Sequence, residues 1–305
     1  MKTPADVESL TKYISEEIYK AFGLSSNHWL HYLLSPFVRL PAGRFSQVAA
    51  RFDQDVAQFG FREAARRILP CFARDYQEVG GENIPTEGPL LVASNHPGAC
   101  DSLVIAANIP RPDLKIIVTG VPFMRSLPCA AEHLIYVPRE GTGRANVIRQ
   151  AIRHLKDNGA LLIFPSGTID PDPELVPDAD QSFDQWSPSV EMMLRYVPQA
   201  RVLLSVVSGV LSSSWLRHPI TYLGSEGLKR RRIAEFMQVI QQMLYPGSIE
   251  IHPSVTFSEP LRVDELTSEG YPILDGIIRQ ARLLMDKHIH GSLSQHPNAT
   301  VDIHP

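Results

Sequence analysis

Two residues five positions apart, His96 and Asp101, carry the side chains needed for acid–base chemistry. They follow the run from Pro89 to Ala93, which is typical of a buried parallel strand because both of its faces are apolar. A catalytic histidine needs a second group to fix its tautomer and support its positive charge, and a nearby carboxylate provides both. The same spacing also fits the capped start of a helix, with Asn95 or Asp101 as the cap. The end of this strand is therefore a candidate acid–base site.

A second predicted strand also ends in small polar residues. Residues 145–155 carry apolar side chains at helical spacing, and Gly159 follows as part of a C-cap. The apolar run 160–164 comes next and leads into the turn Pro165-Ser166-Gly167-Thr168. Ligands of open α/β sheets bind outside the carboxyl ends of strands, so both strand ends are candidate binding segments.

Three sequence blocks together resemble the glycerolipid acyltransferases, a family typified by lysophosphatidic acid acyltransferase. The first block is N-H-x4-D at residues 95–101, and the second is a short apolar strand that ends in Arg139. The third block, F-P-E-G-T-R in the family, is Phe164-Pro165-Ser166-Gly167-Thr168-Ile169 here. The blocks keep the family's order and separations, which is more specific than any single block. The resemblance covers residues 80–288.

The third and fourth blocks depart from the family pattern. Ser166 stands where the family carries a Glu, Ile169 where it carries an Arg, and Ser208 where a Pro is usual. In relatives the missing Glu and Arg belong to the acceptor-phosphate site. Replacing Arg by Ile removes a bidentate, charge-assisted partner of a phosphate. We therefore expect an acceptor that is less anionic or larger than glycerol 3-phosphate, with lysophosphatidate second.

The blocks imply an acyltransferase that moves a fatty acyl group from a thioester to a hydroxyl of a lipid or lysophospholipid. His96 is the expected general base for the hydroxyl and then the acid for the thiolate, with Asp101 holding its other ring nitrogen. Gly98 and the following backbone N–H groups are expected to face the oxyanion. Lys115 and Arg139 are expected to bind an anionic group. The predicted substrate-binding residues are Asn95, Gly98, Lys115, Arg139, Ser166, Gly167 and Thr168.

No metal or organic cofactor is implied, because the thioester brings the activated bond. The expected partners are an acyl-CoA or acyl carrier protein donor and a lipid acceptor, which the sequence leaves open among lysophospholipids, glycolipids and other lipid alcohols. A hydrolase with Ser166 as nucleophile lacks the glycine-flanked elbow. A metal enzyme using His96 and Asp101 has an incomplete ligand set. A catalytically inactive lipid-binding protein is favoured by the altered third block and disfavoured by the retained His–Asp pair.

Composition narrows the class of protein. With 305 residues, 44% of them hydrophobic, the chain can bury a full core. The net charge of −4 gives no basic field for nucleic acid. The three cysteines form no C-x-x-C pair, which fits a reducing compartment. We find neither a signal-peptide pattern nor an apolar run long enough to span a bilayer, and expect a cytoplasmic protein, at most peripheral on the inner face of the membrane.

The periodicity of the chain changes at Gly80-Gly81, from helical spacing to strands alternating with helices. We predict an α/β fold with a mixed, largely parallel sheet flanked by helices and an N-terminal helical region. The predicted regions are 1–79, helical; 80–290, the acyltransferase domain; and 291–305, a disordered tail. The expected strands are 89–94, 115–120, 134–138, 160–164, 201–207 and 249–257, followed by a helix over 271–288.

Two segments each allow two interpretations. Residues 29–40, aromatic and aliphatic with a flanking Arg, fit either a helix lying in lipid headgroups or one docked on the catalytic domain. Lys229-Arg230-Arg231-Arg232 opens a predicted helix. These four cations fit either contact with anionic lipid or coenzyme A phosphates, or a solvated helix end.

Overall fold

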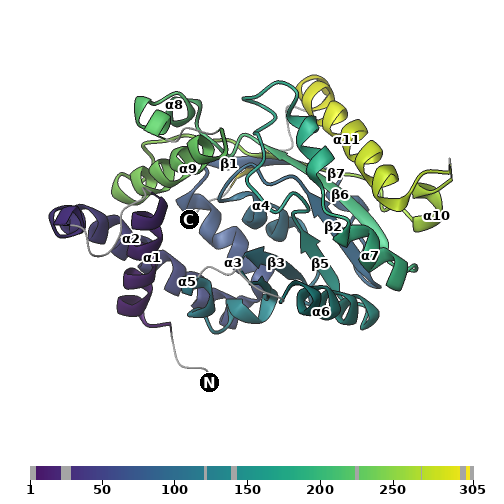
Figure 1. The fold of residues 1–305 in the computed structure, drawn as a ribbon, viewed down its shortest axis with the longest axis horizontal. Coiled ribbons are helices and arrows are strands. Elements are labelled where there is room, and N and C mark those ends of the chain that lie inside the picture. The colour runs from purple at the N-terminus through teal and green to yellow at the C-terminus, as the bar shows by residue number, and fades with distance from the viewer. Residues whose placement is uncertain are drawn as a thin grey trace.

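The computed structural model describes residues 5–21, 29–119, 122–138, 143–223, 227–268, 270–295 and 300–302. In this part of the chain a single eight-stranded sheet has helices on both of its faces (Figure 1). None of the helices described there is both long and apolar enough to cross a membrane. Arg139, the last residue of the second block, lies outside the described residues.

The sheet is mixed, with mostly parallel pairs. Its strands are β1 (Asp75–Val79), β2 (Leu90–Ser94), β3 (Lys115–Thr119), β4 (Leu134–Val137), β5 (Ala160–Ile163), β6 (Arg201–Ser208), β7 (Ser254–Phe257) and β8 (Thr300–Asp302). They lie in the order β4-β3-β5-β2-β6-β7-β1-β8. Only the β6–β7 and β1–β8 pairs of the described strands are antiparallel. Because β2 has β5 on one side and β6 on the other, it lies in the middle of the sheet.

Helices cover both faces and connect the strands. The α-helices are α1 (Val7–Ala21), α2 (Trp29–Phe59), α3 (Phe61–Ile68), α4 (Asp101–Asn108), α5 (Pro122–Arg125), α6 (Arg144–Lys156), α7 (Ser189–Tyr196), α8 (Ser213–Leu216), α9 (Gly227–Leu244), α10 (Val263–Leu266) and α11 (Ile273–Gln295). Short 3-10 helices are η1 (Leu69–Cys71), η2 (Gly81–Asn83), η3 (Ala130–His133), η4 (Ala179–Gln185) and η5 (Pro219–Leu223).

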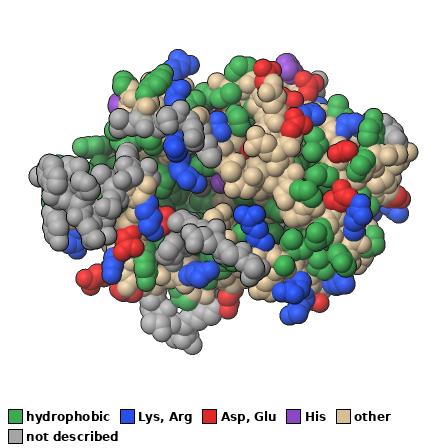
Figure 2. All heavy atoms as spheres, in the orientation of Figure 1, with side chains coloured by type: hydrophobic (Ala, Val, Ile, Leu, Met, Phe, Trp, Pro, Cys, Tyr) green, Lys and Arg blue, Asp and Glu red, His purple; other side chains and the backbone are tan. Residues whose placement is uncertain are grey.

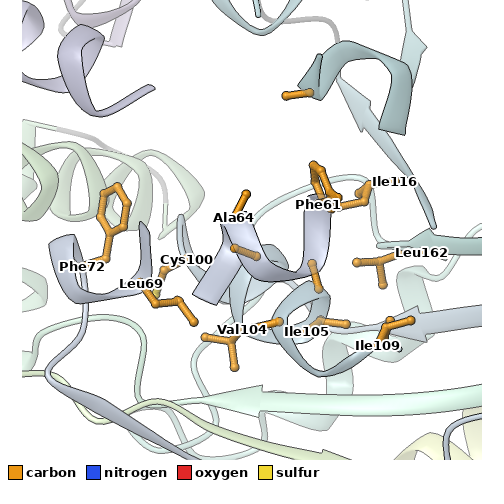
Figure 3. Close-up of a cluster of buried hydrophobic side chains, with 14 of the residues drawn as sticks. Phe61, Ala64, Leu69, Phe72, Cys100, Val104, Ile105, Ile109, Ile116 and Leu162 are labelled. Carbon is orange, nitrogen blue, oxygen red and sulfur yellow. The ribbon is translucent and has the colours of Figure 1, made fainter. Parts of the chain in front are cut away.

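Two apolar cores lie on the two faces of the sheet, because successive strand residues point to opposite faces. In β2, Leu90 and Val92 belong to the core under α1, α2, α3, α4 and α9. Leu91 and Ala93 belong to the core under α6, α7 and α11. Figure 3 shows part of the first core, where α3 and α4 pack together. Every residue of β2 is buried, as its uninterrupted apolar run predicted.

The predicted fold class is confirmed. β2 and β5 are parallel neighbours with Ala93 opposite Ile163, so the residues that follow them emerge at the same edge of the sheet. The other strand boundaries hold to within one residue, and two elements differ by more. The strand expected over 249–257 is confined to β7, and the last helix extends to Gln295. Hydrophobic periodicity does not fix where an element frays, so its ends are the least determined part of a sequence-based prediction.

The N-terminal region contains two features that the periodicity did not predict. α2 runs without a break through Pro36 and Pro41, although each proline removes a helical N–H donor. β1 lies within this region and pairs with β7, and its buried Tyr76 is the only residue of the strand that is fully enclosed. Its sequence is mostly polar, so no apolar run marked it as a strand. The division of the chain at Gly80-Gly81 stays a prediction.

Candidate active site

The two residues before His96 fix its loop to the neighbouring strand β6. Ser94 lies opposite Ser205, and its hydroxyl donates to the Ser205 carbonyl at 3.0 Å. The fully buried Asn95 amide donates to the Val207 carbonyl and accepts from the Val207 N–H, both at 2.8 Å. Asn95 therefore continues the pairing of β2 with β6 beyond the last strand residue. We expected it to bind substrate, and this is corrected, because its buried amide is engaged by the backbone on both sides.

His96 and Asp101 form a contact at the start of α4. His96 Nδ1 lies 2.8 Å from Asp101 Oδ2. The Asp101 side chain is fully buried and 29% of the His96 side chain is exposed, so the imidazole is the part of the pair that a substrate can reach. The Gly98 N–H also donates to Asp101 Oδ2, at 3.1 Å. Since α4 has no side-chain cap at its start, the Asp101 carboxylate orients the ring instead of capping a helix.

Asp170 joins the third block to the first. Its N–H donates to the His96 carbonyl at 2.7 Å, and its Oδ2 accepts the His96 N–H at 2.8 Å. The Ser166 hydroxyl donates to the same Oδ2 at 3.1 Å. The Phe164 ring stacks on the imidazole with 4.5 Å between ring centroids. The backbone of His96, one face of its ring and its Nδ1 are therefore all held by neighbours.

Asp172 shapes the chain that leaves β6. Its Oδ1 accepts the Gly209 N–H at 3.0 Å, and its Oδ2 accepts the N–H groups of Val210 and Leu211 at 3.0 and 3.2 Å. Gly209 has a φ of 69°, a conformation that glycine adopts without strain. A Cβ atom built on Gly98 would lie 3.2 Å from Val210 Cγ2, so the loop of His96 packs closely against this segment. Asp172 thereby holds one wall of the site.

Several carboxyl groups act on the imidazole. Burial alone would lower the pKa of His96, but the Asp101 carboxylate in contact with the ring outweighs it. With further contributions from Glu235 and Asp170, the pKa of His96 rises to about 9. Burial raises the pKa of Glu235 to about 7, although the nearby His96 opposes this. Burial also raises the pKa of Asp170 to about 6, against the hydrogen bonds that it accepts.

α9 contributes a polar face that the sequence analysis did not single out. Glu235, Gln238 and Gln242 lie three and four positions apart, so they occupy one side of the helix. Together with residues 98–100 they line a cavity of about 10 Å³, which has room for one water molecule. The side of the molecule that Figure 2 shows is hollowed near its middle. A histidine lies at the margin of this hollow, beside Lys and Arg side chains.

Three of the predicted binding residues lie in the turn after β5, near His96. Ser166 is half-buried, and its hydroxyl also donates to the Thr168 carbonyl at 3.0 Å. Gly167 and Thr168 are exposed. Gly167 has a φ of 66°, and no atom lies within 4 Å of a Cβ built on it, so the turn is open on that side. A ligand can therefore approach the backbone of this turn closely.

The structure does not bring Lys115 to the site, which corrects our expectation. Lys115 is the first residue of β3 and lies opposite Leu161, which in turn lies opposite Leu91. His96 comes five residues after Leu91 in the direction of the strand. At about 3.3 Å per strand residue, His96 therefore lies about 16 Å beyond the level of Lys115 along the strand direction. A residue at the start of a parallel strand occupies the opposite edge of the sheet from the residues that follow the strands. Apolar runs locate strands, but the pairing register decides which ends meet.

The fold and the site together define an α/β protein with a histidine–aspartate pair at the carboxyl edge of its sheet, an arrangement suited to proton transfer. Residues 77–263 match the family model described as Acyltransferase. Because this match covers more than half of the chain, the protein belongs to the acyltransferase family. The resemblance drawn from the three sequence blocks is thereby confirmed.

A comparison with curated proteins gives no match. Among solved structures, one similar chain is the 1-acyl-sn-glycerophosphate (LPA) acyltransferase PlsC from Thermotoga maritima. It is 17% identical, with a TM-score of 0.44, and the alignment covers 95% of this chain and 98% of that chain.

Proposed function

We propose that this acyltransferase moves a fatty acyl group from an acyl thioester, acyl-CoA or acyl carrier protein, to a hydroxyl of a lipid or lysophospholipid acceptor. The observation that carries the proposal is the 2.8 Å contact between His96 Nδ1 and Asp101 Oδ2 at the carboxyl edge of the sheet. A hydroxyl attacks a thioester efficiently when a positioned base takes its proton. The exposed part of the imidazole is in a position to do so.

His96 acts first as base and then as acid. Asp101 engages Nδ1, so Nε2 is the ring nitrogen that takes the acceptor proton. The acceptor oxygen attacks the thioester carbonyl, forming a C–O bond while its proton passes to Nε2. The tetrahedral intermediate then collapses, the C–S bond breaks, and the imidazolium returns the proton to the leaving thiolate. Asp101 stabilises the imidazolium between these two steps.

The oxyanion of the intermediate needs N–H donors other than that of Gly98. We expected the Gly98 N–H to face the oxyanion, but it donates to Asp101 Oδ2. We assign this role to the N–H groups that follow, beginning with the exposed Ala99. Gly98 instead serves the orientation of the carboxylate and the close packing against Val210.

The hydrolase alternative has less support. A serine nucleophile needs a base on its hydroxyl. The Ser166 hydroxyl donates to the Thr168 carbonyl and to Asp170 Oδ2, and not to the imidazole of His96. The alternative of an inactive lipid-binding protein leaves the buried Asp101 carboxylate beside the imidazole without a purpose.

We propose peripheral membrane contact through residues 29–40 of α2. Phe37 is 75% exposed and Leu40 is 55% exposed, with the exposed Arg39 between them. Val38 packs against the first core, so the helix is docked on one side and free on the other. The changes Phe37→Ser and Leu40→Ser should reduce cosedimentation with anionic lipid vesicles. Tyr196→Ser, a change at a 61% exposed position on α7, is the matched control.

The proposed reaction is tested with palmitoyl-CoA as donor and with lysophosphatidate and monoacylglycerol as acceptors. His96→Ala should lower kcat by about two to four orders of magnitude, and Asp101→Asn should lower it strongly with the fold intact. Ser166→Ala should keep most of the activity. A folded His96→Ala variant with normal turnover contradicts the mechanism. Complete loss of activity in Ser166→Ala would instead favour the hydrolase with Ser166 as nucleophile.

A further inference from the structure

Arg231 on α9 contacts the loop that holds His96. Its Nη2 donates to the carbonyl of Ile169 at 3.2 Å. The next residue, Asp170, makes both backbone hydrogen bonds to His96. Ile169 is apolar and 8% exposed, so the positive charge at this point of the loop comes from α9. Glu235, one helical turn further along α9, lines the same small cavity as residues 98–100, which places this side of the helix at the site.

The Arg231 guanidinium has donors that the described part of the protein does not use. Its Nε is buried and has no hydrogen-bond partner there, and the same is true of the Nε of the neighbouring Arg230. Because the two arginines share this feature, the donors that distinguish Arg231 are those of its Nη groups, one of which contacts the third block. The side chain as a whole is half-buried, so it keeps an open side. Its Nη1 lies over the first turn of α9, 3.7 Å from where a Cβ on Gly227 would be.

The neighbouring carboxylate does not take up these donors. Asp170 interacts electrostatically with Arg231, but its Oδ2 already accepts the His96 N–H and the Ser166 hydroxyl. The one hydrogen bond that Arg231 makes within the described residues goes to a backbone carbonyl, which carries no full charge. A planar guanidinium with five N–H donors is suited to bind a phosphate through two parallel hydrogen bonds.

We propose that Arg231 is a specificity-determining residue that binds a phosphate group of a substrate beside the turn after β5. The inference rests on the proposed acyl transfer and adds the residue that reads the anionic group. The phosphate belongs either to the acceptor, as in lysophosphatidate, or to the donor, as in the coenzyme A or phosphopantetheine part of the thioester. Both sources offer the same chemistry to the guanidinium, and substrates that lack one or the other separate them.

Arg230 provides a matched control on the same helix. Its guanidinium carbon lies 4.0 Å from the centre of the Tyr222 ring, and its Nη2 donates to the Leu216 carbonyl at 3.4 Å. It therefore packs on η5 and α8 instead of the third block. Arg230→Gln removes the same charge from the same end of α9 as Arg231→Gln does, so the two variants differ in which contact they lose.

The experiment crosses two donors with two acceptors. The donors are palmitoyl-CoA and palmitoyl-N-acetylcysteamine, which has no phosphate, and the acceptors are lysophosphatidate and monoacylglycerol. Arg231→Gln should raise the KM of the phosphate-bearing substrate by about 10- to 100-fold, the range expected for a charge-assisted contact. The phosphate-free pair should lose far less, because that loss comes only from the hydrogen bond to Ile169. Arg231→Lys should restore part of the loss, because it keeps the charge but not the fork of donors.

The pattern of loss identifies the source of the phosphate. If KM rises in every reaction that contains lysophosphatidate, whichever donor is used, Arg231 binds the phosphate of the acceptor. If KM rises in every reaction that contains palmitoyl-CoA, Arg231 binds a phosphate of the donor. Equal losses for the phosphate-free pair, or equal losses in Arg230→Gln, overturn the proposal. If the wild type transfers no acyl group at all, the proposed function fails. The phosphate site is then tested by the shift in melting temperature that lysophosphatidate and coenzyme A each cause. A shift present in the wild type and absent in Arg231→Gln supports the phosphate site, and shifts that are equal in both, or absent from both, overturn it.

Discussion

His96 and Asp170, which are 74 residues apart in sequence, hold each other through two hydrogen bonds. The Asp170 N–H donates to the His96 carbonyl at 2.7 Å, and the His96 N–H donates to Asp170 Oδ2 at 2.8 Å. Asp170 thus fixes the backbone of His96, and Asp101 orients its ring. A general base works only when it is within hydrogen-bond reach of the proton it removes, so this support affects the reaction directly.

Asp170→Ala should lower kcat by about 10- to 100-fold, because a misplacement of about 1 Å at a catalytic group has an effect of that order. It should also lower the free energy of unfolding by about 1–3 kcal/mol, since the His96 N–H loses its acceptor. Steady-state kinetics and urea unfolding measure the two effects.

Asp170→Asn is the control for this change, because its amide oxygen still accepts the His96 N–H. It should recover most of kcat. If Asp170→Ala turns over like the wild type, Asp170 does not position His96 for the reaction.

The acidic limb of the pH–rate profile should lie at an unusually high pH. The imidazole acts as a base only when it is unprotonated, and its pKa is raised to about 9. The rate with saturating donor and a neutral acceptor should therefore rise with pH through the neutral range, pass half of its maximum near pH 9 and level off above it. Asp101→Asn removes the main cause of the raised pKa, so the limb should move to lower pH while kcat falls. An acidic limb of the wild type near pH 6.5 contradicts the assignment of His96 as the titrating base.

Gly98→Ala should slow the reaction, because the added methyl group would lie 3.2 Å from Val210 Cγ2 and one of the two segments must shift. We expect a fall in kcat of about tenfold, in the range produced by small displacements of a catalytic group. The double variant Gly98→Ala/Val210→Ala removes the methyl group that is in the way and should regain most of the loss. A double-mutant cycle without any coupling between the two positions would show that their packing does not matter for the loop.

Protonation of His288 should destabilise the fold in acid. His288 of α11 is 4% exposed and lies 2.8 Å from the hydroxyl groups of Thr256 on β7 and Ser208 on β6. Burial lowers the pKa of His288 to about 4. The unfolded chain therefore binds the proton more readily than the folded one. The contribution of the neutral His288 to the stability of the fold is fully present above about pH 6.5 and is lost as the pH falls toward 4.

The size of this effect follows from the shift. A pKa that falls from 6.5 to about 4 corresponds to about 3 kcal/mol of unfolding free energy. Urea unfolding between pH 4.5 and 7.5 should show most of this loss in the wild type and a smaller one in His288→Gln. His290→Gln, at a side chain that is 75% exposed on the same helix, should behave like the wild type. Equal acid sensitivity in all three proteins rules out His288 as the cause.

The sequence by itself determined the class of fold and the pair of groups at its centre. The apolar runs that became β2 and β5 are buried on both faces, and a run of that kind is stable only as an inner strand covered by helices. His96 and Asp101 are close in sequence and separated by a single tight loop, so their contact depends on local geometry. Local spacing therefore sufficed to predict both the strand and the pair.

Tertiary structure alone decided which distant residues complete the site. Asp170 and Asp172 lie in an irregular loop, where no period marks a buried polar side chain, and they act by accepting N–H groups from other segments. Arg231 and Glu235 reach the site because α9 packs over the turn after β5. Lys115 is excluded from it by the register of β3. Periodicity reports which face of an element is buried, whereas the pairing of strands and the docking of a helix arise from long-range contacts that no local pattern encodes.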